Sequence, residues 1–291
     1  MSVRLPNQIS RISRRKFLIG SGAAAASLAV YAGEISRHEI DIVDRPILIR
    51  KLPNAFHDFR LVQISDIHLD EYTEPFFLER IVKHVNDLKP DCVLLTGDFV
   101  TVGVLTSIAR NAAFRCAEIL STLTCPLRYA VLGNHDVGVS ASLVIDALQS
   151  HGIPTLVNDH VPIELGGASL LICGLEDPGT SSPDLTLTIP AHPEGPVILL
   201  SHEPDYADTV IKHPRFPLVD LMLSGHAHGG QIRLPGFGPL VLPPMGRNYP
   251  EGLFRFGQMQ LYVNRGIGTV GLPFRLNCPP EITVITLKPA I

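Results

Sequence analysis

The sequence has 291 residues, of which 45% are hydrophobic and 18% charged, so it can form one large globular domain or two small ones around a sizeable core. The formal net charge of -4 hides an uneven distribution: residues 1–32 hold five of the 24 Lys and Arg residues and none of the 28 acidic ones. The remainder therefore has 19 basic against 28 acidic residues. Such an acidic body argues against nucleic acid as the main partner, because phosphate neutralisation requires Lys and Arg.

The first segment, residues 1–33, reads as an export signal. Adjacent Arg14 and Arg15 precede an apolar, Ala-rich run that ends at Ala32, a pattern that resembles a bacterial twin-arginine (Tat) signal. The apolar run is shorter than the roughly 20 residues of a spanning helix, and Val30-Tyr31-Ala32 offers small residues near a cleavage point. A weak membrane anchor or a surface helix is the alternative. Whether the signal is cleaved or retained as an anchor, we expect the Tat machinery as a partner. The body would then lie in the periplasm or on the outer face of the cytoplasmic membrane.

The five cysteines are widely spaced and form no CxxC pair. An odd count leaves at least one free thiol in an exported protein. Cys92 and Cys173 lie in apolar strand-like runs, where a thiol behaves as a small hydrophobic group. The cysteines are therefore assigned neither a metal nor a catalytic role.

Residues 34–55 are predicted to form a leading edge strand or hairpin, followed by one domain over residues 56–291. Strands and helices alternate in its first half. The apolar spacing predicts strands at 60–65, 92–96 and 129–132, and helices at 75–88, 108–123 and 141–150.

The second half is richer in strands. Two runs around Gly166-Gly167 predict a β-hairpin, and a Pro-rich loop spans 178–196. Further strands are expected at 197–201, 220–224, 260–263 and 281–287. With neither repeats nor an internal linker, the pattern predicts an α/β (α+β) fold of two packed mixed β-sheets flanked by helices.

Five apolar strands end at polar groups that can bind a metal ion. Ligands gather beyond the carboxyl ends of strands in α/β sheets, so groups far apart in sequence can converge there. The candidates are Asp66 with His68, Asp98, Asn134, His202, and His226 with His228. The two last histidines are two residues apart, so an extended backbone can aim both at one point. The absence of a thiolate argues against a structural zinc site and favours Mn, Fe, Zn or a similar ion in a catalytic site.

These motifs, DxH, GDxV, GNHD, SH and GHAHGG, resemble the calcineurin-like metallophosphoesterase superfamily from about residue 59 to 230. The tail from Leu261 to Thr283 resembles its exported, YkuE-like branch. The resemblance implies a four-layer sandwich with two mixed sheets between helices. All positions of the metal-ligand motifs are present in this chain.

The resemblance also implies two divalent metal ions, which could be Mn, Fe, Zn, Ni or Mg. One would be held by Asp66, His68, Asp98 and His228, and the other by Asp98, Asn134, His202 and His226. Two cations lower the pKa of a bridging water from about 15.7 toward neutrality, so that a hydroxide can attack a phosphorus atom in line.

The motif GNHD supplies the expected catalytic pair. His135 would lie beside the leaving oxygen, as a proton donor or as a cationic stabiliser of the phosphoryl group. Asp136 would orient His135, although a cap at the strand end is an alternative role for it.

The predicted function is that of an exported, metal-dependent phosphoesterase acting on phosphodiester or pyrophosphate bonds, with a monomer expected. Phosphomonoester hydrolysis is one alternative, and a non-catalytic metal-binding scaffold of the same fold is another. A metallo-hydrolase of the β-lactamase fold is disfavoured because its HxHxDH signature does not occur in the sequence.

Two apolar segments rich in Gly and Pro, residues 234–245 and 271–274, could select the substrate. They are interpreted either as loops packed over the sheet or as an apolar rim that receives an acyl chain or meets a membrane. The second interpretation favours an amphiphilic phosphoester, such as a phospholipid or a nucleotide-linked acylated sugar. Arg247 and Arg265 could bind phosphate charge or form structural salt bridges.

Overall fold

The structure, a computed structural model, describes residues 13–69, 72–103 and 106–290. The first sheet has five strands and is mixed. Strands β13 and β2 run antiparallel, and the other neighbouring strands of the sheet run parallel to each other. Its strands, in spatial order, are β1 (Asp41–Ile49), β13 (Glu281–Pro289), β2 (Arg60–Ile64), β3 (Cys92–Leu95) and β4 (Arg128–Ala130).

A second, six-stranded sheet has four parallel central strands and one antiparallel strand at each edge. Its order is β11 (Gly252–Phe256), β12 (Met259–Val263), β8 (Leu221–Ser224), β7 (Val197–Leu200), β6 (Ala168–Gly174) and β5 (Asp159–Leu165). A separate two-stranded hairpin consists of β9 (Arg233–Leu234) and β10 (Gly238–Pro239).

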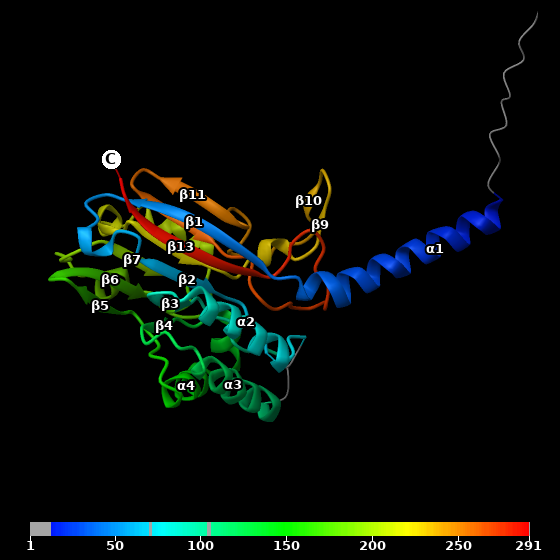
Figure 1. Cartoon of the computed structure of the whole chain (residues 1–291), viewed down its shortest axis with the longest axis horizontal. Helices are drawn as coiled ribbons and strands as arrows, with labels where there is room; N and C mark the ends of the chain where they lie inside the picture. Colours follow the sequence, from blue (N-terminus) through cyan, green and yellow to red (C-terminus); the bar gives the residue numbers. More distant parts are fainter. Residues whose placement is uncertain (1–12, 70–71, 104–105, 291) are drawn as a thin grey trace, which may run out of the picture.

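The two sheets pack face to face through a core that includes Phe56, Leu61 and Leu223. On the outer face of the first sheet lie α2 (Pro75–Leu88), α3 (Thr106–Ser121) and α4 (Asn134–Ser150). On the outer face of the second sheet lie the short helices α5 (Leu185–Thr188) and α6 (Ala207–Val210) with their loops. This arrangement confirms the predicted fold of two packed mixed sheets flanked by helices (Figure 1).

Helix α4 begins seven residues before its predicted start at 141. Ser140 leaves the helical region (φ 173°, ψ 111°) and kinks the helix, which interrupts the periodicity on which the prediction rested. Asn134 and His135 therefore stand on the first turn of a helix.

The N-terminal segment is more continuous than predicted. Helix α1 (Arg14–Val30) passes into a π-helical turn, Tyr31–Ile35, and a 3₁₀ turn, Ser36–His38. The sequence prediction ended the apolar run at Ala32 and judged it too short to span a membrane. The helical stretch is 25 residues long because it continues to His38, and its length and composition are sufficient to cross a membrane. Residues 1–12 of the predicted signal lie outside the described residues.

The leading segment forms one strand rather than a hairpin. Strand β1 is the edge of the first sheet and pairs in parallel with β13, from Asp41 opposite Glu281 to Ile49 opposite Pro289. The segment is therefore built into the domain.

Candidate metal centre

The predicted metal ligands meet at one edge of the sheet pair. They follow β2, β3, β7 and β8, or begin α4. Five of them have backbones in the left-handed region, which non-glycine residues seldom adopt without support from their surroundings. These are Asp66, His68, Asp98, His226 and His228, with φ between 48° and 66°.

The carboxylates and imidazoles form two groups. Asp66, His68 and His228 make up one, and Asp98, His202 and His226 make up the other. Within each group the candidate ligand atoms lie within 4.8 Å of one another, and all six residues are buried. Asp98 faces both groups, because its Oδ2 lies 3.1 Å from His202 Nε2 and 3.5 Å from His68 Nε2.

Hydrogen bonds determine which ring nitrogen of two histidines is available. His202 Nδ1 donates to the Thr96 carbonyl at 2.7 Å, so Nε2 is the nitrogen that faces Asp98 Oδ2 at 3.1 Å, and it carries a lone pair whenever the ring is neutral. His226 Nε2 donates to the Pro244 carbonyl at 2.7 Å, which leaves Nδ1 facing Asn134 Oδ1 at 2.9 Å. A nitrogen lone pair and a carboxylate or amide oxygen that face each other repel unless a cation lies between them. This set of donor atoms therefore fits a metal ion.

The first group has the same character. His68 Nδ1 lies 3.0 Å from the Thr101 hydroxyl, and His68 Nε2 lies 3.2 Å from His228 Nε2. His228 Nε2 is also 3.4 Å from Asp66 Oδ1. One ring nitrogen of His68 is thus held by the protein while the other is aimed at the shared point, as in protein metal sites.

The glycines of the motifs allow the carboxylates to lie against the backbone. A Cβ atom on Gly133 would approach Asp98 Oδ1 to 2.2 Å, and one on Gly225 would approach Asp66 Oδ2 to 2.3 Å. Backbone N–H groups one or two residues further on donate to the same carboxylates: His135 donates to Asp98 at 2.9 Å, and His226 donates to Asp66 at 2.9 and 3.0 Å. Any larger residue at these two positions would displace a candidate ligand.

Electrostatics keep most of the imidazoles neutral. Burial lowers the pKa of His68 to about 3 and that of His226 to about 4, so both rings offer lone pairs at neutral pH. Burial raises the pKa of Asp66 to about 6. His202 is the exception: burial opposes the charged forms of Asp98 and His202, yet the pKa of Asp98 is lowered and that of His202 is raised, because the carboxylate and the imidazolium attract each other.

His135 stands at the edge of the centre and is half-buried. Its Nδ1 accepts the backbone N–H of Val102 at 3.0 Å, so Nε2 is the nitrogen left for a ligand. The ring packs edge-on against His68, with 4.8 Å between centroids.

Asp136 does not bind the His135 imidazole, contrary to the predicted pairing. Its buried carboxylate accepts four backbone N–H groups within 3.2 Å, those of Gly133, Asp98, Phe99 and Val100. Burial and the nearby charge of Asp98 raise the pKa of Asp136, and the hydrogen bonds from the Gly133 and Val100 backbone oppose that rise. The alternative role, a cap, is the one that the geometry supports: Asp136 caps α4 and pins the loop that carries Asp98, while Val102 orients His135.

The two candidate arginines differ. Arg265 binds Glu281 at 2.5 Å and Asp41 at 2.6 Å, so its guanidinium is engaged in a structural salt-bridge cluster, the second of the two roles predicted for it. Arg247 is exposed and lies outside the lining of the cavity described below. Its neighbour Gly246 packs against Ala227, the residue between His226 and His228 in the sequence. Arg247 therefore remains a candidate for binding the phosphate of the substrate.

Sequence reasoning missed the residues that support the ligands. Arg275 is fully buried, donates to the carbonyls of Arg265, Gly266, Gly268 and Cys278, and lies 3.4 Å from His228 Nδ1. A lone Arg in an irregular apolar stretch carries no sequence signal for that role. Thr96 and Thr101 lie within three residues of Asp98, so a search for hydroxyl and carbonyl partners beside the motif could have found them.

A cavity of about 570 Å³ opens over the centre. One side is lined by Asp98, Asn134, His135, His226 and His228. The other side is apolar and comes from the loops around Leu240, Val241 and Leu272. We call these loops, the two segments predicted from the sequence extended by Val270, the apolar rim (residues 234–245 and 270–274). Polar ligands and an apolar wall therefore share one cavity.

Residues 59–230 match the calcineurin-like phosphoesterase family. The chain belongs to this family. It is 35% identical to the metallophosphoesterase YkuE of Bacillus subtilis (strain 168), over 96% of this chain and 99% of YkuE. It is 32% identical to phosphodiesterase YaeI of Escherichia coli (strain K12), over 95% and 99% of the two chains. A transmembrane protein with a metallophosphoesterase domain from Danio rerio is 31% identical, over 99% of this chain and 68% of that protein.

The family and the two ligand groups together identify a metal-dependent phosphoester hydrolase with two divalent metal ions. The similarity to YkuE extends over nearly the whole length of both proteins and confirms the predicted YkuE-like branch.

Proposed function

We propose that this phosphoesterase is exported and cleaves phosphodiester or pyrophosphate bonds in an amphiphilic substrate. The observation that carries the proposal is the shared cavity, in which buried metal-ligand groups face an apolar wall. A substrate with a charged phosphoryl group and an apolar chain matches both sides. The name of the relative YaeI, a phosphodiesterase, supports a diester over a monoester.

In this proposal, Asp66, His68, Asp98 and His228 hold one cation, and Asp98, Asn134, His202 and His226 hold the other. When bound, the two cations acidify a water molecule and offset the negative charge that develops on the phosphoryl oxygens. Asp98 contributes to both positions because it faces both groups. Asn134 contributes a neutral oxygen, which adds no further negative charge to a site that must accept an anion.

His135 has a separate role. Val102 holds its Nδ1, so its Nε2 can donate a proton to the leaving oxygen or stabilise phosphoryl charge from the cavity side. Asp136 acts through the backbone: it holds the turn that places both Asp98 and the first turn of α4.

The first test uses the metal-stripped protein with bis-p-nitrophenyl phosphate and p-nitrophenyl phosphate as substrates. Mn²⁺, Fe²⁺, Zn²⁺, Ni²⁺ and Mg²⁺ are added back singly, with bound metal measured by elemental analysis. Faster hydrolysis of the diester, restored by metal, is the expected result. Preference for the monoester would replace this proposal by a phosphomonoesterase. Two metal ions per chain without turnover of these substrates or of a phospholipid would favour the scaffold alternative.

The second test addresses the substrate class. Leu240→Ser and Val241→Ser place a hydroxyl in the apolar wall, while Leu165→Ser changes an exposed leucine in β5, outside that wall. Loss of contact with two methylene groups is worth about tenfold. We therefore expect at least tenfold lower kcat/KM for a short-chain phosphatidylglycerol and less than twofold change for bis-p-nitrophenyl phosphate. Equal losses on both substrates would reject the lipid-binding role of the wall.

Export is tested by replacing both arginines of the signal, Arg14→Lys with Arg15→Lys. In a Tat-competent bacterium the variant should accumulate in the cytoplasm, whereas the unchanged chain reaches the cell envelope. Unchanged delivery of the variant would reject the Tat route.

A further inference from the structure

The predicted cleavage point at the end of the signal is packed against the body of the protein. Ala32, Gly33 and Ser36 are buried. The backbone N–H of Arg275 donates to the Ala32 carbonyl at 3.0 Å, and a Cβ atom on Gly33 would lie 2.9 Å from the Phe274 ring. A signal peptidase needs an extended, accessible segment, and here the segment is helical and covered.

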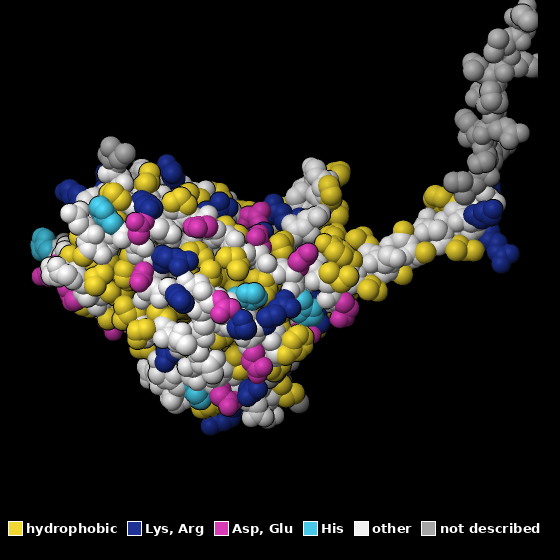
Figure 2. Space-filling model, viewed as in Figure 1, with side chains coloured by type: hydrophobic (Ala, Val, Ile, Leu, Met, Phe, Trp, Pro, Cys, Tyr) yellow, Lys and Arg dark blue, Asp and Glu magenta, His cyan; other side chains and the backbone are white. Residues whose placement is uncertain are grey.

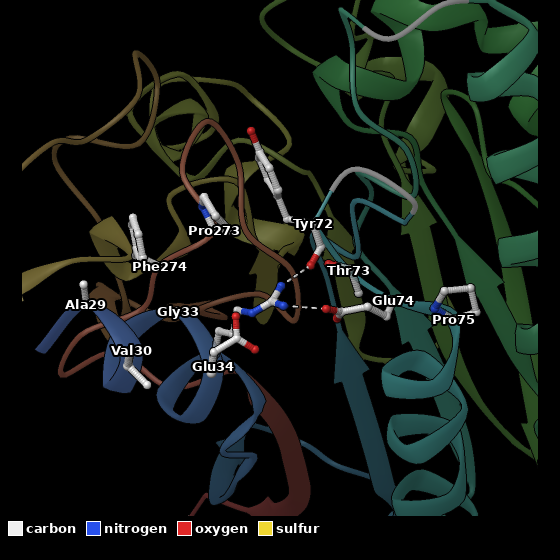
Figure 3. Close-up of a pocket in the computed structure, with 11 residues that line it drawn as sticks. Ala29, Val30, Gly33, Glu34, Tyr72, Thr73, Glu74, Pro75, Pro273 and Phe274 are labelled. Carbon is white, nitrogen blue, oxygen red and sulfur yellow. Dashed lines mark hydrogen bonds and ion pairs between the residues drawn. The ribbon is translucent and has the colours of Figure 1, made fainter. Parts of the chain in front are cut away.

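A cluster of polar contacts fixes the same helix end from the other side. Arg37 pairs with Glu74 and donates to the Tyr72 carbonyl at 2.5 Å, and His38 Nε2 lies 3.1 Å from Glu74. Figure 3 shows the contacts that reach Tyr72 and Glu74 as dashed lines, with Ala29, Val30 and Gly33 on one side and Phe274 beside them. The cavity that these residues line has a volume of about 590 Å³. Helix α1 therefore leaves the body at a defined place.

The apolar rim lies beside this place. Figure 1 shows the hairpin β9–β10 projecting next to the point where α1 leaves the body, and Figure 2 shows hydrophobic side chains on both. The loop from 270 to 275 joins the two features: Leu272 lines the metal-site cavity, and Phe274 packs against Gly33.

The apolar side chains at the tips of the rim expose more hydrophobic surface than we expect of loops that contact only water. Phe237 is 87% exposed, Val241 76%, and Leu240 and Leu272 each 55%. Helix α1 adds 17 residues with no buried side chain. Hydrophobic surface of this extent marks an interaction site.

We propose that α1 is retained after export as a membrane anchor, and that α1 and the apolar rim form one bilayer-contacting surface at the mouth of the metal-site cavity. A lipid leaflet is the occupant that can cover both a helix of spanning length and a neighbouring set of apolar loop tips. The charge distribution agrees: Arg14, Arg15 and Lys16 stand at the inner end of α1, and the first acidic residue after them is Glu34.

This placement has a consequence for access to the site. The rim side chains that would enter the headgroup region, Leu240, Val241 and Leu272, also line the cavity. An amphiphile could therefore pass from the leaflet to the metal centre along a continuous apolar path. The placement rests on the proposed export but not on the hydrolytic reaction, so it can hold or fail independently of the proposed chemistry.

Retention is tested with the full-length chain expressed in a Tat-competent bacterium. The expected result is a protein in the membrane fraction that resists carbonate extraction and contains α1 peptides by mass spectrometry. A mature chain that begins at or near Gly33, or release into the soluble fraction, would overturn the proposal.

Contact of the rim with lipid is tested by fluorescence, because the chain has no Trp. Phe237→Trp introduces a single reporter at the rim. Leu165→Trp introduces a matched one at the other end of the molecule, where the neighbouring Gly166 packs against Ala55, beyond the far end of β1. Both proteins are placed in vesicles of phosphatidylethanolamine and phosphatidylglycerol with brominated acyl chains.

We expect at least twofold quenching for Phe237→Trp and none for Leu165→Trp. Absence of quenching in both would overturn the bilayer-contacting surface. Blue-shifted emission of Phe237→Trp in a lipid-free dimer, unchanged by vesicles, would also overturn it and would mean that a second copy of the chain covers the rim. Quenching of Phe237→Trp together with no hydrolysis of any phosphoester by the unsubstituted, metal-loaded chain would count against the proposed function and leave the membrane placement intact.

Discussion

The strand-end loops and the apolar rim border the same cavity but are built in opposite ways. The six candidate carboxylate and imidazole ligands are at most 8% exposed, and neighbouring backbone groups hold them in place. The rim tips are 55–87% exposed and belong to loops and a two-stranded hairpin. Bond cleavage requires fixed geometry, while recognition of a flexible chain or a leaflet tolerates mobile contacts. Changes to the first region should therefore affect all substrates, and changes to the second only some.

The largest effect is expected for Asp98→Asn. The amide keeps the shape of the side chain but removes the negative charge that faces both ligand groups. Activity on every substrate should fall by more than about 10³-fold, and elemental analysis should find fewer than two metal ions per chain. Asp91→Asn is the control, because Asp91 directly precedes β3 while Asp98 follows it. This variant should keep its activity and both metal ions. Full metal content and activity in Asp98→Asn would remove Asp98 from the centre.

Next in size is His135→Ala. Loss of a group that donates a proton or stabilises phosphoryl charge should lower kcat by about 10²–10⁴-fold. The metal content should stay at two ions per chain, since His135 does not belong to either ligand group. A fall in metal content with the same loss of kcat would mean that His135 is a ligand.

A smaller effect is expected one step away from the metals. Thr101→Val removes the hydroxyl that holds His68 Nδ1, while Thr101→Ser keeps it. Loss of such a contact typically costs about 10–100-fold in metal affinity, which competition with a chelator can measure. Equal affinity in both variants would show that the loop backbone alone orients His68.

The contrast between the two regions also explains what could be predicted. Periodicity and composition predict strands and helices such as 75–88, and the motif residues follow the ends of those strands, so the set of candidate ligands could be predicted from sequence. Their division between two metal ions came from the resemblance to the family. The pairing of Asp136 with His135 was wrong because the partners of Asp136 are backbone N–H groups, which no residue pattern reveals. The N-terminal helix continues to His38 where Ala32 contacts Arg275 and Arg37 pairs with Glu74, and the buried place of Arg275 depends on carbonyls of the tail. Neither follows from local periodicity.

Gln231 ties the rim to the centre and predicts a selective effect. Its side chain donates to the Leu272 carbonyl at 2.8 Å and accepts the Val270 N–H at 2.9 Å. Gln231→Ala should loosen this part of the rim, because each such bond contributes about 0.5–1.5 kcal/mol. We expect about a fivefold loss of kcat/KM on an amphiphilic diester and less than twofold on bis-p-nitrophenyl phosphate. A larger loss on the small substrate would contradict the separation of the two regions.

The smallest effect concerns the contact between α1 and the body, and it depends on pH. Burial opposes ionisation of Glu74, but its hydrogen bond with His38 and the charge of Arg37 hold its pKa below the ordinary value of 4.5. A carboxyl group with a lowered pKa stabilises the folded state above its unfolded pKa, and this contribution is lost as the pH falls through the folded value. Glu74→Gln should therefore lower Tm by a few degrees at most at pH 7, since partly exposed pairs contribute about 0–1 kcal/mol. The difference from the unchanged protein should shrink below pH 4.5, in thermal melts of the detergent-solubilised full chain. A difference that grows toward acid pH would mean that the neutral carboxyl, rather than the ion pair, holds the helix end in place.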